Sequence, residues 1–116
     1  MEIFYEGEKF LDAERKDSIL GKMKGLMFRE LKEDEGMLMV FQEEGRWGIW
    51  MLFVPQDLAL FFLDGEKKVV DKKPAEKMNL DPQTWKVYKP VKKCKYVLEC
   101  KEEKLKEVEA GEKLEW

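Results

Sequence analysis

Three long apolar runs occupy the middle of the chain, at residues 37–41, 46–54 and 57–63. The second and third are apolar at both odd and even positions, so they lack the alternation of a strand with one wet face. Strands without alternation are buried on both faces. We therefore predict that these runs are extended strands inside a sandwich or closed barrel, or strands that a second subunit covers.

The N-terminal residues predict two strands and then a short helix. Residues 2–6 and 9–15 have the composition of strands, and Gly7 separates them. Residues 17–18 offer an N-cap, and Gly25 can close the helix in a left-handed conformation. Between them, apolar residues recur at helical spacing, at Ile19, Leu20, Met23 and Leu26.

A hairpin is predicted after the third apolar run. Asp64 and Gly65 form a turn signal between residues 58–63 and 67–71. Residues 72–84 contain two prolines and an asparagine, which is typical of a long loop. No boundary divides the chain, so we expect a single domain over residues 1–116.

The C-terminal third predicts two water-facing strands, a second helix and a last strand. Residues 85–91 and 94–100 alternate between an apolar face and a face that carries lysine, as exposed antiparallel strands do. Residues 101–110 have a helical pattern that Gly111 ends, and 112–116 return as a strand. The fold class is mainly β with α+β character: an antiparallel β-sandwich or flattened barrel with two short helices.

Composition limits the classes of function and habitat. The 116 residues carry 22 Lys plus Arg against 25 Asp plus Glu, a net charge of -3, which argues against general binding of polyanions. Abundant Glu and Lys with few amide side chains is typical of proteins from thermophiles, although a charged, solvated surface without that meaning is the alternative. We see no secretion signal and no run long enough to span a membrane, so we expect a cytoplasmic protein.

The two cysteines are predicted to be buried and unbridged. If residues 94–100 form one strand, the Cα atoms of Cys94 and Cys100 lie about 20 Å apart, on the same face, which is too far for a disulfide. The chain has no histidine, so neither thiol has an imidazole partner for catalysis or metal binding. We expect two small apolar core residues.

Arg29, Trp50 and Asp57 form the ligand-binding hypothesis. Arg29 leaves one apolar run and Asp57 opens another, so an ion pair between them would satisfy both charges at the margin of the core. We favour a structural ion pair over an anion site at Arg29. Trp47, Trp50, Met51 and Phe53 could form a pocket or an interface, but we expect at least half of them in the core.

A lysine-rich segment supplies the nucleic-acid alternative. Residues 86–95 contain five lysines and no acid, and Trp85, Tyr88 and Tyr96 lie among them. Lysines that bind phosphates beside aromatic rings that stack on bases suit single-stranded nucleic acid, through Lys89, Lys92, Lys93 and Lys95. Lysine also prevents exposed strands from aggregating, and we favour that explanation because we expect the aromatic rings to face inward.

Catalytic chemistry has few candidates in this sequence. Ser18 and Thr84 lie in no nucleophile motif, and the chain offers no imidazole base. Asp57, Asp64 and Asp71 could hold a cation or act as an acid and base pair, which keeps a carboxylate-based hydrolase as the alternative. We expect a binding module for a small molecule or a protein partner, including a second copy, with no cofactor, metal ion or membrane.

The order of motifs resembles a known family. The segments GLMFREL, EDEGMLMVF, IWM, VPQDLALFFLDGEKKVVD and KYVLEC occur in the order found in the family named domain of unknown function 192. The likeness covers about residues 8–115 and implies a mostly antiparallel β domain without an assigned activity. Family members commonly have polar residues between the Trp-Met pair and the proline, whereas residues 52–54 here are Leu, Phe and Val.

Overall fold

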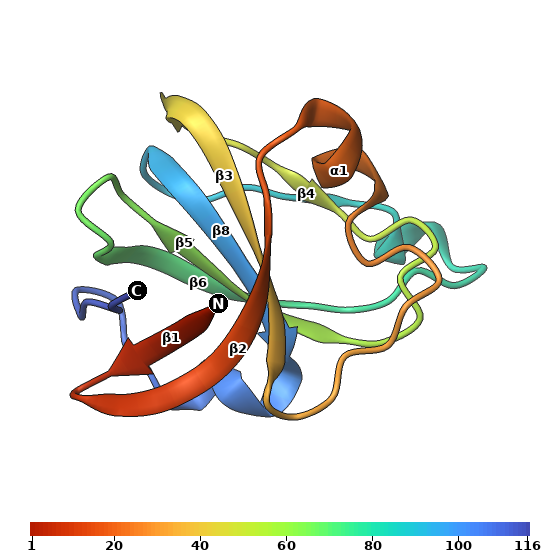
Figure 1. Cartoon of the computed structure of the whole chain (residues 1–116). Coiled ribbons are helices and arrows are strands. Elements are labelled where there is room, and N and C mark those ends of the chain that lie inside the picture. The colour runs from red at the N-terminus through yellow and green to blue at the C-terminus, as the bar shows by residue number, and fades with distance from the viewer.

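The computed structural model contains one curved six-stranded sheet with strand order β1-β2-β3-β8-β5-β6 (Figure 1). The model describes the backbone of residues 1–116 and all side chains except those at positions 19, 20 and 23. A two-stranded sheet of β4 and β7 lies beside the large sheet. The strands are β1 (Glu2–Tyr5), β2 (Glu8–Lys16), β3 (Glu35–Gly45), β4 (Ile49–Trp50), β5 (Leu58–Leu63), β6 (Val69–Ala75), β7 (Val87–Tyr88) and β8 (Cys94–Lys101).

The large sheet is mixed, because β2 and β3 run parallel and every other neighbouring pair is antiparallel. Helix α1 (Ile19–Lys24) lies in the connection between β2 and β3, as a parallel pair requires. Ser18 caps the helix by accepting the Gly21 N–H at 2.9 Å, and Gly25 ends it with a φ of 41°. This confirms the first predicted helix. The side chains at positions 19, 20 and 23, on which the helical spacing was based, lie outside the described residues.

The sheet curls towards one face. Phe10 of β2 and Phe61 of β5 meet edge to face with ring centroids 6.1 Å apart, although β3 and β8 lie between their strands. The concave face holds one apolar cluster, which includes Leu38, Leu98 and Val108. The convex face holds a second cluster, in which strand residues such as Met37 and Leu60 pack under loop residues such as Leu31 and Val54.

The sheet does not close on itself. Its edge strands β1 and β6 are joined only through the C-terminal residues, by isolated bridges that pair Phe4 with Glu115 and Lys68 with Lys113. The sandwich or flattened barrel is therefore not confirmed, and the predicted last strand is reduced to these bridges. The predicted mainly β fold class is confirmed.

The second predicted helix is wrong. Over the described backbone, the other helical pieces are two 3-10 turns, η1 (Pro82–Thr84) and η2 (Glu102–Lys106). Val108, two residues beyond η2, is buried in the concave-face cluster, and the chain turns at residues 107–108 and does not continue as an α-helix. Across the described residues, no helix is long and apolar enough to cross a membrane.

Three strand predictions also need correction. Of residues 46–54 only Ile49 and Trp50 are in a strand, and of residues 85–91 only Val87 and Tyr88. Strand β8 lies inside the sheet between β3 and β5, and its residues 97–100 are buried on both faces, whereas Lys95 and Tyr96 are half-buried. By contrast, all six residues of β5 are buried, and the β5–β6 hairpin turns at Asp64, whose Oδ1 accepts the N–H groups of Glu66 and Lys68.

Candidate functional site

Five of the exposed large apolar side chains belong to segments that lie on one side of the molecule. The segments that carry them, around α1, β4, η1 and the loops between them, gather at the right of Figure 1. Each of these side chains is between 54% and 76% exposed, which is unusual for residues of this size. We call them the aromatic surface: Phe28, Trp50, Phe53, Trp85 and Val87.

Phe28 and Phe53 form the best-defined contact of this surface. Their rings stack with centroids 5.0 Å apart and planes 19° from parallel. The Phe28 N–H donates to the Phe53 carbonyl oxygen at 2.7 Å, which ties the two loops together. Both residues have a φ of 59°, in the left-handed region that costs a non-glycine residue about 1–2 kcal/mol.

Trp50 and Val87 extend the surface along the small sheet. They are opposite partners in the β4–β7 ladder, as are Ile49 and Tyr88, which are buried. The pair Trp50 and Val87 therefore points outward because its neighbours along each strand point inward. Gly48 makes this packing close, because a Cβ at that position would lie 2.4 Å from Val87 Cγ1.

A shallow hollow between β6 and β7 adjoins the aromatic surface. Three lysines surround a floor of Pro74, Val87 and Tyr88, and we call this the lysine hollow: Lys73, Pro74, Lys86, Val87, Tyr88 and Lys89. Lys86 Nζ lies 5.3 Å from the centroid of the Tyr88 ring, and Lys73 Nζ lies 3.3 Å from Asp71 Oδ2.

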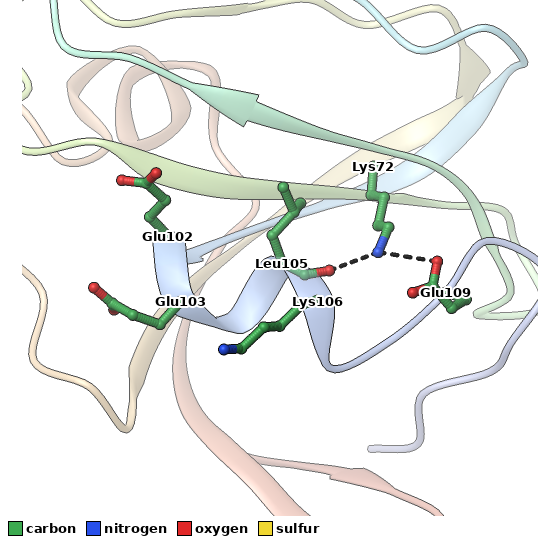
Figure 2. A pocket seen from close by; sticks show the side chains of 6 residues that line it. All are labelled: Lys72, Glu102, Glu103, Leu105, Lys106 and Glu109. Carbon is green, nitrogen blue, oxygen red and sulfur yellow. Dashed lines mark hydrogen bonds and ion pairs between the residues drawn. The ribbon is translucent and has the colours of Figure 1, made fainter.

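A second shallow hollow lies against η2 and β6, and Figure 2 shows its side chains. Lys72 Nζ donates to the Leu105 carbonyl oxygen at 2.7 Å and pairs with Glu109 Oε2 at 3.1 Å. Its charge is therefore already satisfied. Glu102, Glu103 and Lys106 form the rest of the rim. Among the described residues, no group of three or more Cys, Asp or Glu side chains is placed to hold a metal ion.

The Arg29 and Asp57 pair predicted from the sequence is not formed. Arg29 Nη1 contacts Glu14 Oε2 at 2.6 Å, and Asp57 Oδ1 instead accepts the Lys77 N–H at 2.8 Å. The hydrogen bond from Arg29 and, as the next largest effect, that from Lys16 lower the pKa of Glu14 to about 2. Trp50 is exposed, and neither hollow brings it together with Arg29 or Asp57. A ligand role for these three residues stays a prediction.

The sequence also suggested that three carboxylates, those of Asp57, Asp64 and Asp71, could hold a cation or act as an acid and base pair. Asp57, Asp64 and Asp71 each accept backbone N–H groups, Asp71 from Lys72 and Val91. Such bonds use these carboxylates to fix turns and loop ends. They supply no geometric support for a hydrolase.

The lysine-rich segment is only partly as predicted. Lys89 lines the lysine hollow, Lys92 and Lys93 are exposed, and Lys95 is half-buried. Tyr88 faces inward as expected, but Trp85 is exposed. The nucleic-acid role of these lysines stays a prediction.

The structure also shows where the other aromatic candidates and the two cysteines lie. Met51 is buried and Trp47 is half-buried, whereas Trp50 is exposed. Cys94 and Cys100 are buried and unbridged, as predicted. They belong to different apolar clusters, however, because the β3–β8 ladder shifts register before Cys94 and the simple alternation ends there.

Glu99 is a buried carboxyl group that sequence reasoning missed. It lies in β8 opposite Met37 of β3 and Leu60 of β5, and only 2% of it is exposed. Its Oε1 has no hydrogen-bond partner among the described residues. Burial raises the pKa of Glu99 to about 7. The available signal was Val97 two positions earlier, since an apolar neighbour on the same side of the strand indicates a dry face.

Comparison with known proteins defines the family and the fold. Two solved structures superpose on nearly the whole chain, each at 22% sequence identity. One is a candidate transcription regulator from Sinorhizobium meliloti 1021, with a TM-score of 0.82 and coverage of 98% of this chain and 89% of that one. The other is a protein of unknown function from Novosphingobium aromaticivorans DSM 12444, with a TM-score of 0.81 and coverage of 99% and 82%.

At this identity the two structures establish a shared fold and nothing about activity. The search of curated proteins found no match. A family model, described as uncharacterized ACR, matches residues 2–116. Because that match spans essentially the whole chain, the protein belongs to the DUF192 family, as its order of motifs indicated.

Proposed function

We propose that this chain is a protein-binding module and that the aromatic surface is where its partner docks. The observation that carries the proposal is the Phe28 and Phe53 pair. Two stacked aromatic rings are exposed on loops, and each belongs to a residue with a strained backbone. Strain of this kind clusters at binding sites, where the surrounding structure holds a side chain in place for a ligand.

The shape of the surface favours a protein over a small molecule. Ligand pockets usually bury most of a small molecule inside a concave site. Here both hollows are shallow, and the aromatic side chains stand out from the surface. Exposed Trp and Phe that are fixed by their neighbours resemble the anchor residues of protein interfaces.

A peptide selection tests the proposal directly. A random peptide library displayed on phage is selected against the purified protein, and the enriched peptides are synthesised and titrated by fluorescence anisotropy. We expect Phe28→Ser with Phe53→Ser to weaken binding by about tenfold or more, because hot-spot truncations cost roughly 2 kcal/mol or more. The matched control is Val91→Ser, which removes an exposed apolar side chain outside the aromatic surface.

Two measurements protect the test against an unfolded variant. Circular dichroism and thermal unfolding compare the double variant with the wild type, and Phe28→Gly with Phe53→Gly provides a second pair that suits the left-handed backbone. The proposal is overturned if no peptide is enriched, or if the enriched peptides bind the folded double variants as tightly as the wild type.

A further inference from the structure

We infer that the partner segment is acidic, with carboxylates that bind the lysine hollow beside apolar residues that contact the aromatic surface. This inference rests on the proposed function and specifies the chemistry of the partner. The two sites share Val87, which belongs to the aromatic surface and also lines the hollow. One continuous segment can therefore occupy both.

The charges around the hollow are incompletely neutralised within the chain. Residues 82–98 contain five lysines and no acid. Among the described residues, neither Lys86 nor Lys89 pairs with a carboxylate within 4.0 Å, and Lys73 has the single partner Asp71. Positive groups gathered around an apolar floor repel one another, so carboxylates from a partner would be attracted there.

The charge of the whole chain makes the lysine hollow a specific location for an acidic partner. The chain as a whole carries a net charge of -3, so its overall charge does not attract an acidic partner, and the attraction comes from the local group of lysines. The floor of the hollow is also fixed in place. The Tyr88 hydroxyl accepts the Glu76 N–H at 3.1 Å, and the Tyr88 ring is buried below Lys86.

Single-stranded nucleic acid is the less favoured partner for the same lysines. Sequence-independent binding of a strand uses a row of exposed rings on which successive bases stack. In this segment Trp85 is exposed, but Tyr88 is buried and Tyr96 is half-buried and packs edge to face on Trp116. Residues 85–96 themselves therefore present one exposed ring, that of Trp85, and the net charge of -3 opposes a polyanion.

Two matched synthetic peptides test the inference. The acidic peptide alternates Glu with Phe and Leu, and its twin has Gln at every Glu position. Binding of each labelled peptide is measured by fluorescence anisotropy at low and at high salt. We expect the acidic peptide to bind about tenfold more tightly than its twin at low salt, and the advantage to shrink as salt screens the charges.

Charge reversal then locates the effect. Lys86→Glu with Lys89→Glu should abolish the advantage of the acidic peptide. Lys68→Glu with Lys113→Glu is the matched control: it changes the net charge equally, on two exposed lysines next to the C-terminal segment, and should retain the advantage. Phe28→Ser with Phe53→Ser should weaken both peptides alike.

The outcomes separate this inference from the proposed function. If both peptides bind equally and the Phe variants weaken both, the binding surface stands and the acidic partner is refuted. If neither peptide binds, the library selection enriches no peptide and the protein shows no self-association, the proposed function is refuted as well. Binding of an oligo-dT strand that is lost in the Lys86 and Lys89 variant, with no preference for the acidic peptide, would assign the hollow to nucleic acid. Concentration-dependent self-association that the Phe variants abolish, without peptide binding, would assign the surface to a second copy.

Discussion

Glu99 provides the sharpest test of the core. The change is Glu99→Gln, which keeps the size of the side chain and removes its ability to ionise. In the folded protein the carboxyl group lies between Met37 and Leu60, is 2% exposed and has a raised pKa of about 7 because of burial. In the unfolded chain the same group has its ordinary pKa of 4.5.

The direction in which stability changes with pH follows from which state, folded or unfolded, keeps the Glu99 proton. Between pH 4.5 and 7 the folded state keeps the Glu99 proton and the unfolded state releases it, so wild-type stability falls as the pH rises. Each pKa unit corresponds to 1.36 kcal/mol, so the loss is about 3 kcal/mol by pH 7 and is constant above it. The glutamine variant lacks this loss. We expect the two proteins to be about equally stable near pH 4.5 and the variant to be about 3 kcal/mol more stable at pH 8.

Urea or guanidinium unfolding between pH 4 and 8 measures the difference. The chain has no histidine, and the other carboxyl groups, which titrate at the acid end of this range, contribute equally to wild type and variant and so cancel. Glu33→Gln, at an exposed position, should parallel the wild type at every pH. A stability difference between Glu99→Gln and wild type that stays constant with pH, or that changes in the opposite direction, would refute the reasoning.

Three further predictions concern a glycine, the two cysteines and one exposed phenylalanine. Gly48→Ala places a Cβ 2.4 Å from Val87 Cγ1, so it should destabilise the β4–β7 pair and weaken peptide binding, as measured by urea unfolding and anisotropy. Cys94 and Cys100 should resist iodoacetamide at pH 8 in the folded protein and react after unfolding, because burial raises both thiol pKa values, that of Cys94 to about 11. Phe28→Gly should lose binding while the free energy of unfolding stays equal or rises by up to about 1 kcal/mol, because glycine relieves the positive φ; a large loss of stability would contradict this.

Local signals predicted the elements whose neighbours along the chain determine their structure. Residues 58–63 were expected to be a fully buried strand with a turn at Asp64, and both were confirmed. The first helix was expected between Ser18 and Gly25, where an N-cap and a residue with positive φ coincide. In these places propensity, pattern and turn chemistry agree, and such agreement makes a prediction secure.

The position of a strand within the sheet could not be predicted in the same way. The alternation in residues 94–100 indicates one apolar face, but the strand lies between β3 and β5 and residues 97–100 are buried on both faces. By that alternation Glu99 falls on the lysine-bearing face, which was expected to meet water. Lateral order in a sheet depends on contacts between distant segments, and no local pattern contains that information. The parallel pairing of β2 with β3 was missed for the same reason.

The largest errors fall in the segments that carry the aromatic surface. Residues 46–54 and 85–91 were expected to bury their apolar side chains, yet Trp50, Phe53 and Val87 are exposed. Pattern reasoning assumes that the chain alone removes apolar groups from water. Here the fold leaves these groups exposed and holds Phe53 at a positive φ, so contacts within the chain cover them only in part. These failures therefore support the proposed binding surface, on which a partner would complete the burial that the sequence pattern indicates.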